Sequence, residues 1–323
     1  MKAIALMSGG LDSRLAAKLV LDQGVEVHAL HFTSLFAPGG ERQARSAAEQ
    51  FRIPLTVENV TDELLALVRT PRYGHGSGVN PCIDCRIMEL RRARRHLEPL
   101  AASFFITGEV LGQRPMSQRK DTMKLIERQA GLEGLVLRPL CALALEPSIP
   151  ELEGWVDRQK LLGITGRRRV EQMRLAAALG ITDYPSPAGG CRLTEPNYAA
   201  RMRDLLGHDE LIVDNVLLLE VGRHFRLGPS AKLVVGRIEE ENGRIQELIR
   251  DGDYLLDALG VSGPLSLARG AFDEDLLRLA ARITVRYGKG RSLSEVPVQV
   301  TGPASFTFTV PPAQDEELEP LRV

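Results

Sequence analysis

A glycine turn between an apolar run and a helical pattern, at the start of the chain, is the feature that most constrains its fold. Residues 8–13 read Ser-Gly-Gly-Leu-Asp-Ser and follow the apolar residues 3–7. Adjacent glycines let the backbone bend sharply and approach a ligand. The first N–H groups of the following helix have no internal partners and carry the positive end of its dipole. The turn therefore predicts a phosphate cradle, with an ordinary strand–helix turn as the alternative.

The residue types in this turn suit a nucleotide bound with a metal ion. A Walker loop would place Lys before its Ser or Thr, and this chain has Leu11 and Asp12 before Ser13. Hydroxyl groups can donate to phosphate, and Asp12 can hold Mg²⁺ that accompanies it. The candidate nucleotide-binding residues are Ser8, Gly9, Gly10, Asp12 and Ser13.

Apolar runs alternate with helical patterns over the first part of the chain. Strands are expected at residues 1–7, 25–32, 54–60, 104–106 and 135–140, and helices at 12–23, 41–51, 61–69, 83–100, 151–163 and 167–179. This alternation predicts a parallel α/β sheet. Because such sheets bind ligands beyond the carboxyl ends of their strands, the segments at Phe32 and at Thr107–Gly108 should meet the glycine turn.

At 323 residues the chain is long enough for two domains. The texture changes after about residue 207, where short β-like runs occur at 232–235, 282–287, 298–300 and 305–310. We therefore expect an α/β domain over residues 1–203 and a smaller α+β domain over residues 204–323.

Three cysteines form a pattern typical of metal or sulfur chemistry. Cys82 and Cys85 make a C-x-x-C at the start of a basic helix, where the dipole and arginines should lower a thiol pKa. Cys191 lies in a Pro/Gly-rich loop that should be exposed. Three readings stay open: a [4Fe–4S] cluster with one free iron, catalytic thiols that carry a persulfide, and a zinc site or plain packing. Cys141 is expected to be a buried, inert thiol rather than a fourth ligand.

The formal net charge is −1, but the basic residues are clustered. Such clusters can bind RNA phosphates, although a solvated helix face is the alternative. No apolar run approaches the length that spans a bilayer, and no signal peptide is evident, so we expect no membrane association and a cytoplasmic location. The candidate RNA-binding residues are Arg91, Arg92, Arg94, Arg95, Arg167, Arg168 and Arg169.

Over roughly residues 1–200 the chain resembles the PP-loop tRNA thiolation enzymes, of the 2-thiouridylase and 4-thiouridine synthetase type. The resemblance rests on residues 8–13, Asn-Pro-Cys-Ile-Asp-Cys at 80–85, Ile-Thr-Gly-Glu at 106–109, Arg-Pro-Leu at 138–140 and Ser-Pro-Ala-Gly-Gly-Cys at 186–191. It implies an adenine nucleotide alpha hydrolase-like fold that binds ATP and Mg²⁺ and adenylates a nucleobase carbonyl, releasing pyrophosphate.

The resemblance also assigns roles to residues. Phe32, Thr107 and Gly108 would flank the adenosine. Our own choice for the catalytic metal contact is Asp12. Sulfur would be carried by Cys82, Cys85 and Cys191, as a cluster or a persulfide. The expected partners are tRNA and a sulfur donor (sulfide or a persulfide carrier protein), and a homodimer stays open.

The chain departs from the family in two places. Glu109 stands where 2-thiouridylases commonly have His, and residues 222–227 and 234–237 are similar to the RNA-binding region of NFACT proteins. A core strand pair with a basic hairpin is the alternative for this second segment. Two other functions also stay open, a PP-loop amide-forming ligase and a non-catalytic RNA-binding protein that senses nucleotide.

Overall fold

The computed structural model describes residues 1–185 and 190–323. The chain divides into two compact units, Met1–Thr194 and Glu195–Val323, and each is described by itself. Residues 186–189 of the Pro/Gly-rich cysteine loop lie outside the described residues. Nowhere in the described ranges is a helix both long and apolar enough to cross a membrane.

The first unit is built on a five-stranded sheet in which every neighbouring pair is parallel, as the sequence predicts. Its order is β3-β2-β1-β4-β5. The central strand β1 pairs Ala3 with Val27 of β2 on one side and with Phe104 of β4 on the other. The strands are β1 (Lys2–Leu6), β2 (Glu26–Thr33), β3 (Leu55–Asn59), β4 (Phe104–Ile106) and β5 (Val136–Leu137).

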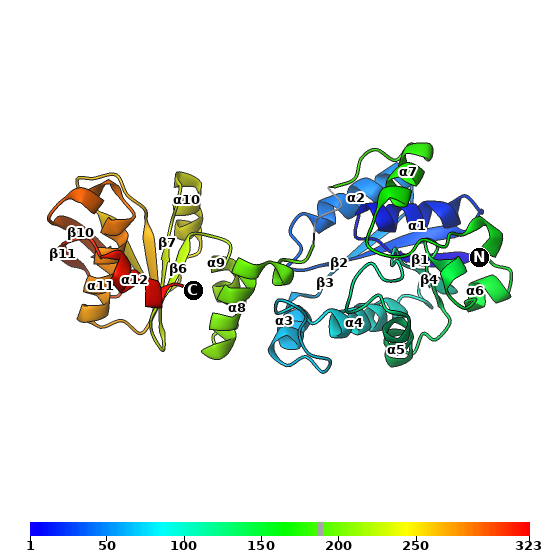
Figure 1. The fold of residues 1–323 in the computed structure, drawn as a ribbon, viewed down its shortest axis with the longest axis horizontal. Helices are drawn as coiled ribbons and strands as arrows, with labels where there is room; N and C mark the ends of the chain where they lie inside the picture. The colour runs from blue at the N-terminus through cyan, green and yellow to red at the C-terminus, as the bar shows by residue number, and fades with distance from the viewer. Residues whose placement is uncertain (186–189) are drawn as a thin grey trace. The chain divides into compact units, whose positions relative to one another are not determined.

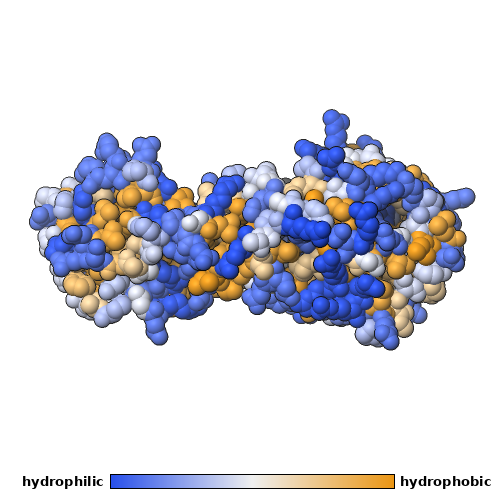
Figure 2. Space-filling view, turned by 90° about the horizontal axis from the view of Figure 1, so that it is seen from below, coloured by the Kyte–Doolittle hydropathy of each residue, from blue (hydrophilic) through white to orange (hydrophobic). Residues whose placement is uncertain are grey.

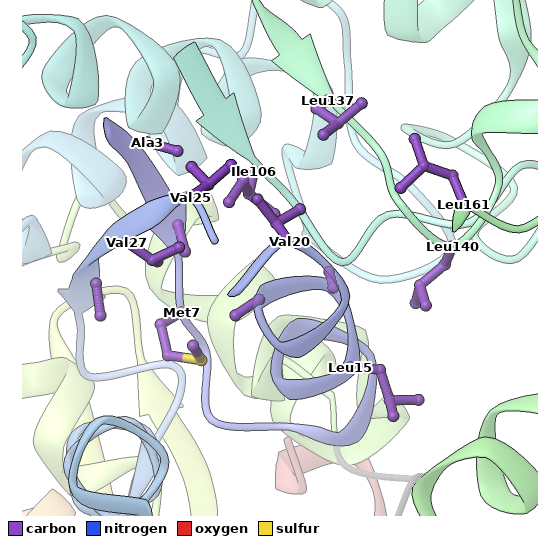
Figure 3. Packing of buried hydrophobic residues seen from close by; sticks show 14 of the residues in the cluster. Ala3, Met7, Leu15, Val20, Val25, Val27, Ile106, Leu137, Leu140 and Leu161 are labelled. Atoms are coloured by element: carbon purple, nitrogen blue, oxygen red, sulfur yellow. The ribbon is translucent and has the colours of Figure 1, made fainter. Parts of the chain in front are cut away.

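Helices cover both faces of this sheet (Figure 1). One face carries α1 (Leu11–Leu21), α2 (Gly40–Phe51) and α7 (Val170–Ala178), and the other carries α3 (Thr61–Arg69), α4 (Cys82–Arg94) and α5 (Lys120–Ala130). Figure 3 shows the core beside α1, where Leu15 and Val20 of the helix lie near Met7, Ile106 and the chain that carries Leu140 and Leu161. Burial on both sides explains why the strands read as continuous apolar runs.

The strand order creates a switch point beside β1. The chain moves outward from β1 to β2 and β3 and then returns to β4 on the other side of β1. The loops after β1 and β4 therefore leave the sheet toward opposite faces, at the kind of position where open α/β sheets bind ligands. This is the place where the sequence predicts a nucleotide.

The second unit has a six-stranded antiparallel sheet in the order β11-β10-β8-β9-β7-β6. Helix α11 (Glu274–Arg286) packs on one face, and α9 (Val213–Leu218) and α10 (Glu239–Glu247) supply Leu218 and Ile245 to a cluster on the other. The strands are β6 (Arg223–Gly228), β7 (Ala231–Val235), β8 (Tyr254–Ala258), β9 (Ser266–Gly270), β10 (Val296–Thr301) and β11 (Phe306–Val310).

Two expected elements are wrong. The β-like run at 282–287 lies mostly in α11, where Ile283, Thr284 and Val285 are buried and Thr284 Oγ1 donates to Ala280 O at 2.9 Å. Packing of an apolar helix face thus outweighs the β-branched preference of this run. The helix expected at 151–163 is reduced to α6 (Ile149–Leu152) and a 3₁₀ turn, with Gly154 at φ 67° between them.

The units divide after Thr194, earlier than the expected boundary at 203/204. Helix α8 (Pro196–Gly207) belongs to the second unit because its polar side chains bond there. Arg201 donates to Leu219 O at 2.6 Å, and Asp204 accepts from Arg226 and Lys232. Helix α8 is therefore held in the second unit by polar contacts with residues that lie later in the sequence.

We expect Leu15→Ala to lower the free energy of unfolding of the first unit by about 2–5 kcal/mol, because Leu15 is fully buried and leaves a cavity. Urea unfolding followed by the fluorescence of Trp155, the chain's single tryptophan, measures this in the first unit alone. The control Leu152→Ala removes a side chain that is 70% exposed and should change stability by less than about 0.5 kcal/mol. Equal losses in both variants would contradict the packing described.

Candidate nucleotide and sulfur site

The glycine turn after β1 is held in shape by contacts with α2. Gly9 has φ 75°, and a Cβ there would lie 2.2 Å from the carbonyl carbon of Gln43, so no other residue fits. The buried Arg14 donates to Gly9 O at 2.8 Å and to Gln43 O at 3.2 Å. Ser8 Oγ and Ser13 Oγ lie 3.1 Å apart across the turn. The turn is thus formed before any ligand arrives.

The loop after β4 approaches this turn directly. A Cβ on Gly108 would lie 2.5 Å from Ser13 N and 2.6 Å from the carbonyl carbon of Asp12, so only glycine permits this approach. Thr107 beside it is buried. Phe32, half-buried at the end of β2, borders the same edge, where Met7 N donates to Leu30 O at 2.9 Å. The structure brings together the three segments that the sequence expects to meet.

Asp12 is the acidic residue of the turn, and side chains from two other segments position its carboxylate. Its Oδ2 accepts a hydrogen bond from Gln113 Nε2 at 2.7 Å and lies 3.6 Å from Arg169 Nη2. Its Oδ1 is buried and has no hydrogen-bond partner among the described residues. A buried carboxylate oxygen without a donor is costly, and a cation there would satisfy it. The residues present therefore fit Mg²⁺ that arrives with a nucleotide.

The three arginines at 167–169 do not share one environment. Arg167 and Arg168 are exposed, whereas Arg169 is half-buried against Asp12 at the start of α7. Arg169 is thus placed beside the phosphate cradle instead of on the surface with its neighbours. The sequence analysis named all three as candidate RNA-binding residues, because a cluster of charges does not show which side chain is directed toward the interior.

Cys82 is the first residue of α4, and the loop that precedes it is tightly packed. Asn80 Nδ2 donates to Cys82 Sγ at 3.0 Å and lies 3.6 Å from Met116 Sδ. Val79 N donates to Leu193 O at 3.0 Å, and a Cβ on Gly78 would lie 2.0 Å from that same oxygen. The segment that leads to Cys82 therefore packs against the segment that follows Cys191.

The three thiols lie close enough to influence one another. Burial, chiefly, raises the pKa of Cys85 well above its ordinary value, and Glu89 and Cys191 add to the rise. Burial likewise raises the pKa of Cys191 to about 11, with a further contribution from Cys82. The expected lowering at the C-x-x-C is therefore wrong for Cys85, because desolvation outweighs the nearby arginine. Cys191 is half-buried, not exposed.

The thiols are not arranged as a finished metal site. Within the described ranges, no group of three His, Cys, Asp or Glu side chains has the geometry to hold a metal ion. Cys141 is buried, as expected, and its Sγ donates to Glu109 O at 3.3 Å. Burial raises the pKa of Cys141 to about 11, which suits an inert thiol.

A buried ionic network holds the cysteine helix to the sheet, and sequence reasoning missed it. Glu109 Oε1 accepts from Arg86 of α4 at 3.0 Å, and its Oε2 accepts from Arg138 at 3.0 Å. Burial opposes the charge on Glu109, but both guanidinium groups outweigh it and lower its pKa to about 2. Glu109, which stands where 2-thiouridylases commonly have His, is thus an acid with two arginine partners. The only sequence signal for this pairing was that both arginines lie in or beside the motifs quoted above.

The arginines of α4 differ in their hydrogen-bond partners and in their exposure to solvent. Arg92 pairs with Glu58 and Glu63, and Arg91 donates to Gln129 O at 2.9 Å. Arg91, Arg94 and Arg95 remain exposed. Figure 2 views the first unit from the side on which α3, α4 and α5 lie and shows strongly hydrophilic side chains gathered there. This surface could meet RNA phosphates, although Arg92 is neutralised by two carboxylates.

Family models match both parts of the chain. The model of the thiamine biosynthesis protein ThiI matches residues 1–149, and the model of the NFACT protein RNA binding domain matches residues 222–322. The first part of the chain is thus similar to ThiI, and the second part is similar to the RNA binding domain of NFACT proteins. The predicted resemblance to both families is confirmed.

Curated relatives match the first of these domains. The tRNA-specific 2-thiouridylase MnmA of Syntrophotalea carbinolica is 36% identical over 117 residues, which is 32% of this chain and 33% of that protein. The "Probable tRNA sulfurtransferase" of Alkaliphilus metalliredigens is 30% identical over 147 residues, 44% of this chain and 36% of that protein. The chain therefore spans about a third of the length of these enzymes, to which it is homologous.

Solved structures include a 4-thiouridine synthetase in complex with RNA and bound ATP. Its identity to this chain is 23% and the TM-score is 0.41, covering 68% of this chain and 52% of that one. The fold described above rests on the strand order and register of this chain alone.

We expect Gly108→Ala to weaken binding of α,β-methylene-ATP by about tenfold or more, because the added Cβ drives the β4 loop away from Ser13. Isothermal titration measures the affinity. The control Gly163→Ala places its Cβ 3.4 Å from the Leu143 Cβ, an ordinary contact, and should bind as the parent does. Unchanged affinity in Gly108→Ala would show that this approach does not shape the nucleotide site.

We expect Glu109→Gln to lower the free energy of unfolding at pH 7 by about 3–5 kcal/mol, because it removes a charged partner from the buried Arg138 and the half-buried Arg86. The folded-state pKa of about 2 lies below the unfolded value, so the stability from this carboxylate is present above about pH 4.5 and is lost as the pH falls toward 2. The gap between parent and variant should therefore narrow over that range. Glu146→Gln, at an exposed acid, is the control in urea titrations. A gap independent of pH would contradict the network.

Proposed function

We propose that this chain is an ATP-dependent tRNA thiolation enzyme. The observation that carries the proposal is one short segment that reaches both parts of the site. Gln113 donates to Asp12 of the glycine turn, and three residues later Met116 lies beside Asn80, the donor to Cys82. Between them, the charge of Arg114 acts on Cys191 and opposes in part the rise that burial causes in its pKa. A segment that reaches both the nucleotide cradle and the region of Cys82 and Cys191 suits sulfur transfer to an adenylated carbonyl.

The need for ATP follows from the chemistry of the carbonyl. Its oxygen is a poor leaving group, so sulfur cannot displace it directly. Attack of that oxygen on the α-phosphate would form an adenylated base and release pyrophosphate. The N–H groups at the start of α1 and Arg169 would stabilise the developing phosphate charge, and Asp12 would hold Mg²⁺, whose positive charge adds to this stabilisation. AMP then becomes the leaving group.

Sulfur delivery is proposed as persulfide chemistry between Cys191 and Cys82. A persulfide donor would transfer its outer sulfur to the Cys191 thiolate, which releases the donor's own thiolate and leaves a persulfide on Cys191. The terminal sulfur of a Cys191 persulfide would form the C–S bond as the C–O bond to AMP breaks. The Cys82 thiolate would then cleave the S–S bond, which leaves the thiocarbonyl on the base and a Cys82–Cys191 disulfide. An external thiol reductant must reduce this disulfide. The hydrogen bond from Asn80 Nδ2 to Cys82 Sγ would hold the sulfur in position for that attack.

The nucleic acid is proposed to be tRNA. The exposed Arg91, Arg94 and Arg95 of α4, with Arg167 and Arg168, would contact phosphates of the first unit's substrate. The NFACT RNA-binding domain supplies a second contact surface. Arg92 and Arg169 would contribute less, because acids of this chain already engage them.

A [4Fe–4S] cluster on Cys82, Cys85 and Cys191 is the second form of this proposal. The mutual influence of the three thiols favours it, and no step is derived through the cluster. We expect protein purified without air to contain less than about one iron per chain, because thiolates hold a cluster and burial favours the neutral thiols at Cys85 and Cys191. Iron and labile-sulfide analysis measures this, and about four of each per chain would establish the cluster instead.

We expect the protein, given tRNA, α-³²P-ATP and a sulfur donor, to form AMP, pyrophosphate and a thionucleoside. Cys191→Ala should lose thionucleoside formation by more than about 10²-fold and retain ATP binding, because it removes the sulfur carrier and no part of the nucleotide turn. Cys141→Ala, at the inert thiol, is the matched control and should keep turnover. Formation of ADP, or turnover by Cys191→Ala, would contradict the proposal.

A further inference from the structure

Two buried amides connect helix α7 to the acid of the nucleotide turn. Gln172 of α7 is fully buried, and its Nε2 donates to Gln113 Oε1 at 3.1 Å. Gln113 Nε2 in turn donates to Asp12 Oδ2 at 2.7 Å. The chain of bonds therefore runs from α7 through the segment after β4 to the start of α1.

The carboxylate sets the direction of every bond in this chain. A carboxylate only accepts, so Gln113 must turn its NH₂ group toward Asp12 and its carbonyl toward Gln172. Gln172 must then present its own NH₂ group. Its Oε1 is left buried without a partner among the described residues. An amide kept at this cost in a core position is better explained by a role in the site than by stability.

We infer that Gln172 and Gln113 are positioning residues for Asp12. Gln113 donates to Asp12 Oδ2, and Gln172 orients Gln113. Arg169 Nη2 lies 3.6 Å from the same oxygen. The buried Oδ1 is thereby left as the free acceptor of this carboxylate. Through this relay α7 determines how Asp12 meets the cation that accompanies the nucleotide. The inference rests on the proposed function, because it assumes that a nucleotide binds this turn with Mg²⁺.

The relay can be reversed by one substitution. In Gln172→Glu the new carboxylate only accepts, so Gln113 would turn its NH₂ group toward position 172 and its carbonyl oxygen toward Asp12. Two oxygens would then face each other, and Asp12 would move from its position. Gln172→Met removes the bond to Gln113 without reversing the amide and should have a smaller effect.

The test is a Mg²⁺ titration of α,β-methylene-ATP binding, followed by calorimetry. We expect Gln172→Glu to raise the half-saturating Mg²⁺ concentration by about tenfold and Gln172→Met by about two- to threefold. Binding without Mg²⁺ should stay within about twofold of the parent in both. Gln159→Met, at an exposed glutamine, is the control and should titrate as the parent does. Thermal unfolding identifies any variant that has lost its fold.

A double-mutant cycle separates a relay from two independent effects. Gln113→Leu removes the bond to Asp12, so adding Gln172→Glu to it should raise the Mg²⁺ requirement no further. A folded Gln172→Glu protein with the parent's Mg²⁺ requirement, or additive effects in the cycle, would overturn the inference. If the parent binds the nucleotide but releases no pyrophosphate with tRNA, only the proposed function fails. If the parent binds no nucleotide, both fail.

Discussion

The close approach of Gly108 to the backbone of Asp12 and Ser13 is the contact on which the site depends. It joins the loop after β4 to the start of α1 across the switch point of the sheet. A side chain at this position would separate the two loops, and the segment at 113–116 would move with the β4 loop. The turn, Asp12 and the cysteine region are therefore held in register by a contact between backbones.

Burial and charge act against each other throughout this domain, and their balance differs from group to group. Glu109 keeps its charge because two guanidinium groups face it. Cys85 has Glu89 as a neighbour as well as Arg86, so burial favours its neutral form. A helix N-terminus alone is thus not enough to activate a thiol. The position of Cys82 Sγ depends on a hydrogen bond from Asn80, which is itself fixed in a packed loop.

Asp12 shows how an active-site acid can be oriented from a distance. The side-chain amide of Gln113, in the segment after β4, holds the Asp12 carboxylate in position. Gln172 of α7, much later in the chain, orients the Gln113 amide. Such a relay lets changes in α7 affect the chemistry at the turn without any contact with substrate. The same helix region supplies Arg169, so one element contributes both a cation and an orienting amide.

The sequence by itself determined the elements whose signals are local. The glycine turn, the alternation of strands and helices and the Thr107–Gly108 pair were predictable, because each depends on residue type at fixed spacing. The tertiary structure decided the rest. The sequence could not show that Glu109 is paired with Arg86 and Arg138, that Arg169 turns inward while Arg168 does not, or that residues 282–286 continue a helix. Those outcomes depend on which distant groups become neighbours, and desolvation and pairing energies exist only once the chain has folded.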